Sequence, residues 1–266
     1  ITSKSLNNSG TISSQGNTQI QTGQAINSGT LAAGRELKLN ASDINNSKGI
    51  INGQRIELNA NSLNNTNGKI QQTGTQALAL NTGSLSNANN GLIGYEPISS
   101  GTGTGTGTGS SGNTGTGTST PSTATGGGSS TVVQPAPVAL ADGAINISGA
   151  VNNDGGQITA NGGIDLTAQN GLDNHATLNL NKLTVSGNRL DNRSGTLTVS
   201  HAQIQTDSIN NTAGQFGSTG DIQLATDRLT NTQGKLTASG GITAVVQGAT
   251  LNDQGTFASN GALQLN

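Results

Sequence analysis

Apolar and polar residues form a short phrase that recurs about every 20 residues along the chain. The stretch SLNNTNGKI, residues 62–70, shows its parts: an apolar residue, an asparagine two positions later, a glycine, and a second apolar residue. The first apolar residues stand 18 to 22 positions apart, except for one interval of 66. They are Leu6, Ile26, Ile44, Leu63, Leu85, Val151, Leu172, Leu190, Ile209, Leu229 and Leu251. Such a period is typical of repeat architectures.

Alternation with period two inside each repeat predicts very short β-strands. Apolar pairs two positions apart, such as Ile56 with Leu58, follow the phrase in most repeats. An apolar residue also stands two positions after most of the phrase glycines, as Ile70 does after Gly68. Asn, Gly and Ser fill the remaining positions, and they favour turns because Asn and Gly tolerate positive φ. We expect about three short strands in each repeat, joined by tight turns.

A repeat this small buries nothing alone, so we expect successive repeats to stack. If each strand pairs in parallel with its equivalent one turn on, about 4.8 Å away, like residues form ladders. Leu, Ile and Val fill the interior, while asparagine amides hydrogen-bond to one another and to turn backbone groups. The expected structural ladder consists of Asn8, Asn46, Asn65, Asn87, Asn153, Asn174, Asn192, Asn211 and Asn231, with Ser28 and Asp253 at the same place in two other repeats.

The long interval between Leu85 and Val151 contains the tract SSGTGTGTGTGSSGNTGTGTST and then VVQPAPV. By composition this segment is flexible. Removing the 47 residues 95–141 leaves 66 − 47 = 19, the spacing of one coil. We therefore expect residues 1–94 and 142–266 to form one continuous all-β solenoid, a parallel β-helix of about eleven coils, with residues 95–141 as a long disordered loop insertion. A long loop costs little more to close than a short one. Two separate short solenoids joined by the tract are the alternative.

Composition narrows the partners of the chain. Of its 266 residues, 41 are Gly, none is Cys, Met or Trp, and the net charge is −2. The 11 basic and 13 acidic residues are spread without runs, which argues against nucleic acid or an anionic membrane as a partner. No apolar stretch approaches the roughly 20 residues of a membrane-spanning helix. Zero cysteine excludes disulfides and suits a chain that passes unfolded through an export channel.

The sequence offers little support for catalytic or metal chemistry. We expect that the chain is not an enzyme and that it binds no cofactor and no small-molecule substrate. Sugar hydrolysis needs facing carboxylates, usually with aromatic platforms. The outward row of the second strand is expected to be Lys38, Glu57, Ala79, Asn146, Asp165, Thr184, Gln205, Gln223, Thr243 and Gln264, without carboxylates on neighbouring coils. Lys38 and Glu57 are expected to form a cross-strand ion pair. His175 and His201 stand at different offsets in their repeats, so we expect solvated side chains rather than metal ligands.

The stretches LNNTNGKI, LDNRSGTLTVSHAQIQTDSI and LTNTQGKLTASGGITAVV resemble the haemagglutinin repeats of filamentous haemagglutinin-like exoproteins. This family includes two-partner-secretion adhesins and contact-dependent growth inhibition effectors of Gram-negative bacteria. The resemblance covers all the repeats and leaves out residues 95–141. It implies a right-handed parallel β-helix, export by an outer-membrane two-partner-secretion transporter acting on regions outside this sequence, and display on the outer cell surface.

The expected function is therefore structural: a fibre segment of a secreted, surface-displayed adhesin that mediates cell–cell or host-cell contact. A cell-surface receptor or glycan would be its partner. Within the family, the alternative is a stalk or delivery segment of a contact-dependent growth inhibition toxin. From another class, the alternative is a carbohydrate-active β-helix enzyme or lectin, which an acidic cluster on one face of the coils would favour.

Overall fold

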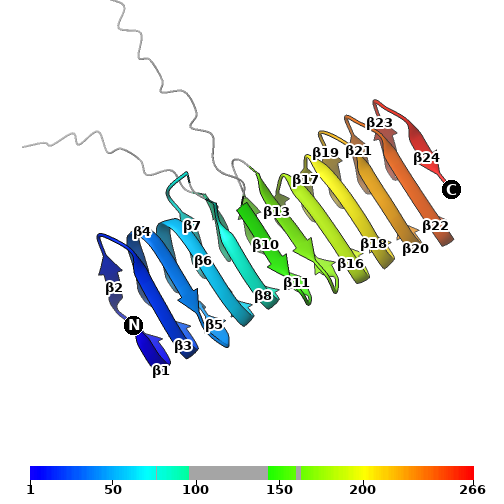
Figure 1. The fold of residues 1–266 in the computed structure, drawn as a ribbon. Coiled ribbons are helices and arrows are strands. Elements are labelled where there is room, and N and C mark those ends of the chain that lie inside the picture. The colour runs from blue at the N-terminus through cyan, green and yellow to red at the C-terminus, as the bar shows by residue number, and fades with distance from the viewer. Residues whose placement is uncertain (76, 96–142, 160–162) are drawn as a thin grey trace, which may run out of the picture. The chain divides into compact units, whose positions relative to one another are not determined.

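The computed structural model describes residues 1–75, 77–95, 143–159 and 163–266. All regular structure in these ranges is β-strand, and the strands form a parallel β-solenoid of about 11 turns (Figure 1). The first twelve strands are β1 (Thr2–Asn8), β2 (Thr11–Ser14), β3 (Thr18–Asn27), β4 (Thr30–Asn40), β5 (Asp43–Asn45), β6 (Ile50–Asn64), β7 (Lys69–Gln72), β8 (Ala79–Ser86), β9 (Leu92–Tyr95), β10 (Gly143–Ile147), β11 (Val151–Asn152) and β12 (Gln157–Thr159). The others are β13 (Ile164–Ala168), β14 (Leu172–Asp173), β15 (Thr177–Asn179), β16 (Lys182–Asp191), β17 (Thr196–Val199), β18 (His201–Asn210), β19 (Gln215–Ser218), β20 (Ile222–Thr230), β21 (Lys235–Ala238), β22 (Ile242–Leu251), β23 (Thr256–Ser259) and β24 (Leu263–Leu265).

Each strand pairs in parallel with its equivalent one turn further along the chain. The longer strands form one ladder, in which β16 pairs with β18, β18 with β20 and β20 with β22. The short strands that follow the asparagine turns form another, in which β17 pairs with β19, β19 with β21 and β21 with β23. Figure 1 shows these strands side by side, with the two chain ends at opposite ends of the solenoid. The predicted parallel stacking of repeats is confirmed.

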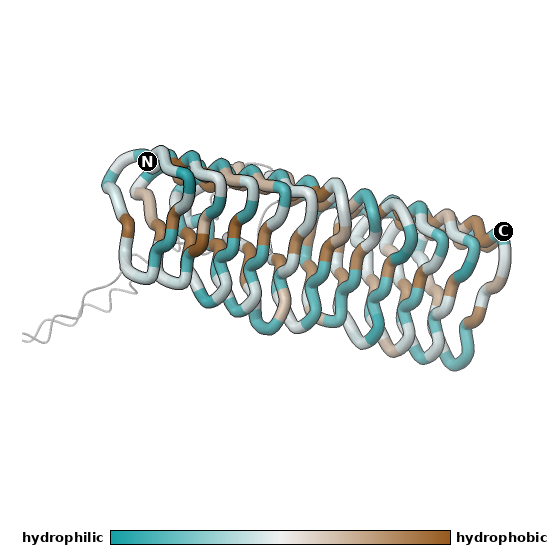
Figure 2. Tube along the Cα trace, turned by 90° about the horizontal axis from the view of Figure 1, so that it is seen from below, coloured by the Kyte–Doolittle hydropathy of each residue, from teal (hydrophilic) through white to brown (hydrophobic). Residues whose placement is uncertain are grey.

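The core consists of apolar columns that run along the solenoid axis. One column joins the longer strands through Leu39, Leu58, Leu80, Ile145 and Leu166, each opposite the next and at most 1% exposed. A second joins the start of β6 to the short strands β7, β9, β12 and β15 through Ile51, Ile70, Ile93, Ile158 and Leu178, all fully buried. Figure 2 shows hydrophobic positions recurring at the same place on successive turns. Burying each such side chain contributes about 1.5–3 kcal/mol, so many thin layers replace one large core.

The strands on the two sides of residues 96–142 pair with each other. Strands β10 and β11 both pair with β8, and β12 pairs with β9. Val151 lies opposite Leu85, so residues 66 positions apart occupy the same place in consecutive turns. The flexible insertion expected at residues 95–141 lies outside the described residues, apart from the backbone of Tyr95.

The asparagine, rather than the largest apolar residue, sets the register of the second and last turns. Ala25 lies opposite Leu6, and Asn27 lies opposite Asn8. The assignment of Ile26 and Ser28 to these two places was therefore wrong by one residue. Ala25 is fully buried, whereas Ile26 is only half-buried. This register keeps Asn27 opposite Asn8 and preserves the buried hydrogen bond between them. The bond outweighs the apolar area that is lost when Ala25, rather than Ile26, fills the core position.

The last turn repeats this one-residue shift. Thr250 lies opposite Leu229 and Leu251 lies opposite Thr230, so the next residue, Asn252, takes the asparagine place that had been assigned to Asp253. Leu251, expected to begin the phrase inside the core, is 53% exposed.

Candidate functional site

A buried amide ladder runs the length of the described solenoid. In each step, the side-chain N–H of one asparagine donates to the Oδ1 of its equivalent in the next turn, at 2.7–2.9 Å. The ladder contains Asn8, Asn27, Asn46, Asn65, Asn87, Asn153, Asn174, Asn192, Asn211, Asn231 and Asn252. It therefore includes all nine residues expected from the sequence, together with Asn27 and Asn252. Nearly all of these side chains are buried.

Six of the ladder amides also donate to a backbone oxygen of the turn beside them. Asn65 Nδ2 donates to the backbone oxygen of Gly68 at 3.2 Å and to that of Leu92, one turn on, at 3.1 Å. Asn67 between them has a positive φ of 54°. A Cβ on Gly68 would overlap the backbone oxygen of Asn46 and lie 2.6 Å from Asn65 Oδ1, so only glycine fits. The recurring Asn and Gly of the sequence are thus explained by one hydrogen-bonded turn.

A second amide ladder lies on the outer face of the longer strands. Asn59 Nδ2 donates to Asn40 Oδ1 at 2.8 Å, Asn81 donates to Asn59 at 2.9 Å, and Asn146 donates to Asn81 at 3.0 Å. These bonds point toward the N-terminal end, opposite to those of the buried ladder. Asn81 and Asn146 are exposed, and the other two are half-buried. We call these four residues the exposed amide ladder.

The outward row expected from the sequence divides into three rows. Ala144, rather than Asn146, lies opposite Ala79, and it is followed by Asp165, Lys182 and His201. Asn146 begins the run Thr167, Thr184, Gln203, Gln223, Thr243 and Gln264 in the next row. Gln205 belongs to a third row, opposite Ser186 and Ala225. The expected row was wrong because these strands carry several outward positions, and sequence spacing alone does not align them.

The expected ion pair between Lys38 and Glu57 is confirmed. Lys38 Nζ lies 2.7 Å from Glu57 Oε1, and Arg55 lies 3.5 Å from the other oxygen of the same carboxylate. The hydrogen bond from Lys38, and then that from Asn59, lowers the pKa of Glu57. Both partners lie on the solvent-facing side, so the pair contributes only a few tenths of a kcal/mol.

A charged cluster occupies the asparagine corner around β14. His175 Nε2 lies 3.3 Å from Asp191 Oδ1, and its Nδ1 lies 3.7 Å from Asp154 Oδ1. Arg193 Nη2 lies 2.7 Å from Asp191 Oδ2. Burial raises the pKa of Asp191, but hydrogen bonds from Arg193 and its positive charge outweigh burial and leave that pKa below its ordinary value. The sequence did not predict this cluster, because its members stand in three different repeats.

The two histidines lie apart. His201 begins β18, opposite Lys182, away from the corner that holds His175. Across the described ranges, no group of three or more His, Cys, Asp or Glu side chains is placed to hold a metal ion. The cluster around His175 therefore consists of contacts from this imidazole to carboxylates of two neighbouring turns, beside the Arg193–Asp191 ion pair.

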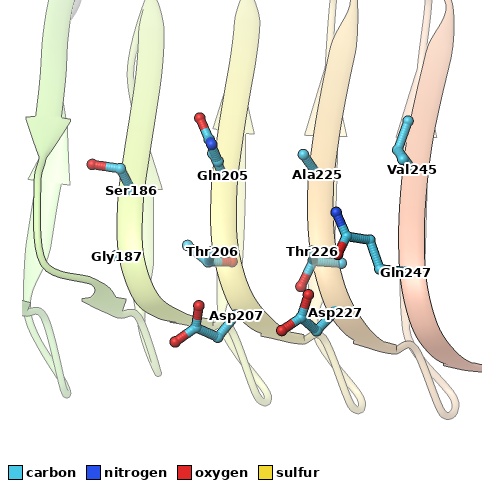
Figure 3. Close-up of a pocket in the computed structure, with 10 residues that line it drawn as sticks. All are labelled: Ser186, Gly187, Gln205, Thr206, Asp207, Ala225, Thr226, Asp227, Val245 and Gln247. Carbon is cyan, nitrogen blue, oxygen red and sulfur yellow. The ribbon is translucent and has the colours of Figure 1, made fainter.

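Three open grooves lie along the longer strands, on the side of the solenoid that carries the exposed amide ladder. One, of about 440 Å³, is lined among others by Gln205, Thr206, Asp207, Asp227 and Gln247. Figure 3 shows Asp207 and Asp227 at equivalent places on neighbouring strands, with their carboxylates turned the same way. The preceding threonines, Thr206 and Thr226, lie opposite each other. We call this the acidic groove.

The acidic groove has one feature of a glycosidase site. The strands that carry the two carboxylates are neighbours, and neighbouring strands lie about 4.8 Å apart. This spacing is close to the carboxylate separation of about 5–5.5 Å used by retaining enzymes. Both aspartates are exposed, however, and the groove lining contains no aromatic residue. The sequence did hold a signal for this pair, because Thr-Asp recurs at positions 206–207 and 226–227. That signal was missed because only the second-strand row was compared.

The other two grooves, each of about 450 Å³, lie along the turns that contain Gln21 to Gln169. They share Ala60, Asn61 and Asn81, so they form one continuous hollow, which we call the amide groove. Its lining contains amides, hydroxyls and small apolar side chains, and no charged residue.

Comparison with protein families, curated proteins and solved structures gave no significant match. Among the described residues there is no helix of the length and apolarity needed to cross a membrane. Function must therefore be inferred from the fold and its surfaces.

Proposed function

We propose that the chain is a stiff fibre segment of a secreted, surface-displayed bacterial adhesin of the haemagglutinin-repeat kind. The observation that carries the proposal is the buried amide ladder, which links every described turn to the next at 2.7–2.9 Å. Such a ladder has no gap at which the solenoid would bend. The segment would hold adhesive parts away from the cell that makes it.

Reach follows from the geometry of the turns. With neighbouring strands about 4.8 Å apart, the eleven ladder asparagines span about 50 Å. Bending the axis would stretch backbone and amide hydrogen bonds on one side of every turn at once, and the many aligned bonds resist this together. A spacer of this kind needs neither catalytic groups nor a cofactor, and we propose that the segment is not an enzyme.

The repeat resemblance supplies the cellular setting of the proposal. In that setting a Gram-negative cell exports the chain through an outer-membrane two-partner-secretion transporter and displays it outside the cell. The absence of cysteine supports such a route, because no disulfide has to form or break during export. Delivery of a growth-inhibiting toxin would use the same rod.

Antibodies raised against this chain provide the test. On intact cells that produce the protein, they should label the outer surface, and their Fab fragments should reduce cell–cell or cell–host attachment. Labelling that appears only after the cells are permeabilised would contradict the proposal.

The acidic groove favours one second candidate, a carbohydrate-active enzyme. Hydrolysis of soluble polysaccharides by the purified chain, abolished in the Asp207→Asn/Asp227→Asn double variant, would establish it. We expect no release of reducing sugar from either protein, because no aromatic platform lines the groove and both carboxylates face solvent.

A further inference from the structure

We propose that the amide groove binds a linear, uncharged, hydroxyl-rich polysaccharide. The inference rests on the proposed function, because it names the surface and the ligand chemistry through which a displayed fibre makes contact.

The amide groove has the length of a polymer site. Its lining row begins at Gln21, passes through the exposed amide ladder and ends at Thr167. These residues stand on six consecutive turns, so the row is about 24 Å long. Volume and length together suit several linked sugar rings lying along the axis rather than one small molecule.

The lining chemistry selects a neutral ligand. Side-chain amides from the exposed amide ladder are joined by the hydroxyls of Ser42, Ser148 and Thr167. Sugar hydroxyls donate and accept hydrogen bonds, and so do amides and hydroxyls, so the two surfaces match. A phosphate or carboxylate would find no cation among the lining residues, which makes anionic polymers the poorer ligands.

The amides are held in place before any ligand arrives. Asn81 and Asn146 each use one side-chain N–H in the exposed amide ladder, which leaves the second N–H of each as a donor for a ligand. The Oδ1 of Asn59 is already fixed by Asn81, and its Nδ2 by Asn40 and Glu57. Ordering these side chains therefore costs little on binding.

Repetition compensates for the weakness of single contacts. Without an aromatic platform each sugar contact is weak, but equivalent amides recur on consecutive turns, so one chain engages several of them at once. A peptide strand gains most from the backbone groups of a sheet edge, and this groove offers side chains on a sheet face instead.

Affinity electrophoresis of the purified 266-residue chain tests the proposal. Gels contain pullulan, mixed-linkage β-glucan or glucomannan as linear neutral polymers, and alginate or polygalacturonate as anionic ones. At least one neutral polymer should retard the chain, and the anionic polymers should not. Titration calorimetry then gives a Kd for the polymer that binds.

Paired variants locate the site. The Asn81→Ala/Asn146→Ala variant should bind about tenfold more weakly, because two hydrogen-bonding side chains leave the groove. The matched control is Asn179→Ala, which replaces an exposed asparagine on β15. Strand β15 belongs to the ladder of short strands, outside the amide groove, so this variant should bind as the parent does. Thermal melts followed by circular dichroism confirm that both variants remain folded.

Several outcomes would overturn the inference: no retardation by any neutral polymer, tighter binding of an anionic polymer, or unchanged binding by the double variant. Slow migration in gels without polysaccharide would assign the groove to a second copy of the chain instead. A separate small-angle scattering measurement keeps the two proposals distinct. A rod that binds no polysaccharide leaves the fibre function standing, whereas a binding chain that is not a rod contradicts the fibre function alone.

Discussion

The two amide ladders use the same side chain and the same bond in different surroundings. The buried ladder has an asparagine in every described turn, and several of these amides also bond to their own turn. The exposed amide ladder covers four turns and then gives way to Thr and Gln in the same row. Water replaces a lost partner at the surface and does not do so inside. We therefore expect the buried ladder to contribute much more to the stability of the fold than the exposed one does.

Breaking the buried ladder should have the largest effect. Asn65→Ala removes four hydrogen bonds: the one that Asn65 Oδ1 accepts from Asn46, and those that its Nδ2 donates to Asn87 Oδ1 and to the backbone oxygens of Gly68 and Leu92. Each lost bond costs about 0.5–1.5 kcal/mol, and more where a buried group keeps no other partner, so we expect a loss of about 3 kcal/mol or more. Urea unfolding followed by circular dichroism measures this loss. A loss below 1 kcal/mol would mean that the solenoid relaxes around the gap.

Crowding the same turn should have the next largest effect. Gly68→Ala places a methyl group against the backbone oxygen of Asn46 and against the ladder amides, at a cost of about 2 kcal/mol. Gly16→Ala is the matched control, because a Cβ there meets no atom within 4 Å. Equal melting temperatures for the two variants would show that the turn is less tightly packed than the structure indicates.

Acid should weaken the charged cluster beside the buried ladder. The pKa of Asp191 is lowered by folding, so its contribution to stability is present above the unfolded value of about 3.9 and is lost as pH falls through the folded pKa. Unfolding free energies measured between pH 7 and pH 2.5 should therefore fall less for Asp191→Asn than for the parent, by about 1 kcal/mol. Asn179→Ala, which replaces an exposed and uncharged side chain, is the control and should retain the parental slope. Identical slopes for all three proteins would exclude a role for the cluster.

Breaking the exposed amide ladder should have the smallest effect on stability. Asn81→Ala removes two surface hydrogen bonds, and the unfolding free energy should change by less than about 0.5 kcal/mol. Urea unfolding of Asn81→Ala beside Asn65→Ala sets the two ladders against each other directly. A loss similar to that of Asn65→Ala would remove the distinction between them.

The fold was predictable because its smallest unit is repeated many times. A single phrase such as Leu63–Asn65–Gly68 is weak, but its recurrence exposed the period, the parallel stacking and nine ladder asparagines. The two ladder members missed, Asn27 and Asn252, follow a small or polar residue, Ala25 or Thr250, where an apolar one was sought. Hydrophobic size was the wrong guide in those turns, because the hydrogen-bonding amide decides the register.

The surface was less predictable than the interior. Interior residues recur from turn to turn, so a doubtful assignment in one turn can be checked against the neighbouring turns. Outward residues vary from turn to turn and allow no such check. Asp207 and Asp227 lie side by side only because Thr206 pairs with Thr226, and this register depends on how many residues the intervening turns use. The groove that contains them, and the exposed amide ladder, became visible only once every strand was aligned.

The ladder asparagines are separated by 18 to 22 residues in most turns and by 66 across one turn, yet each interval advances the axis by one strand spacing. The number of residues in a turn therefore does not determine how far that turn extends the solenoid. Extra residues in a turn leave the length of the solenoid unchanged, and only the gain or loss of a whole repeat alters that length, in steps of about 4.8 Å. The length of the solenoid is therefore set by the number of its turns and not by the number of its residues.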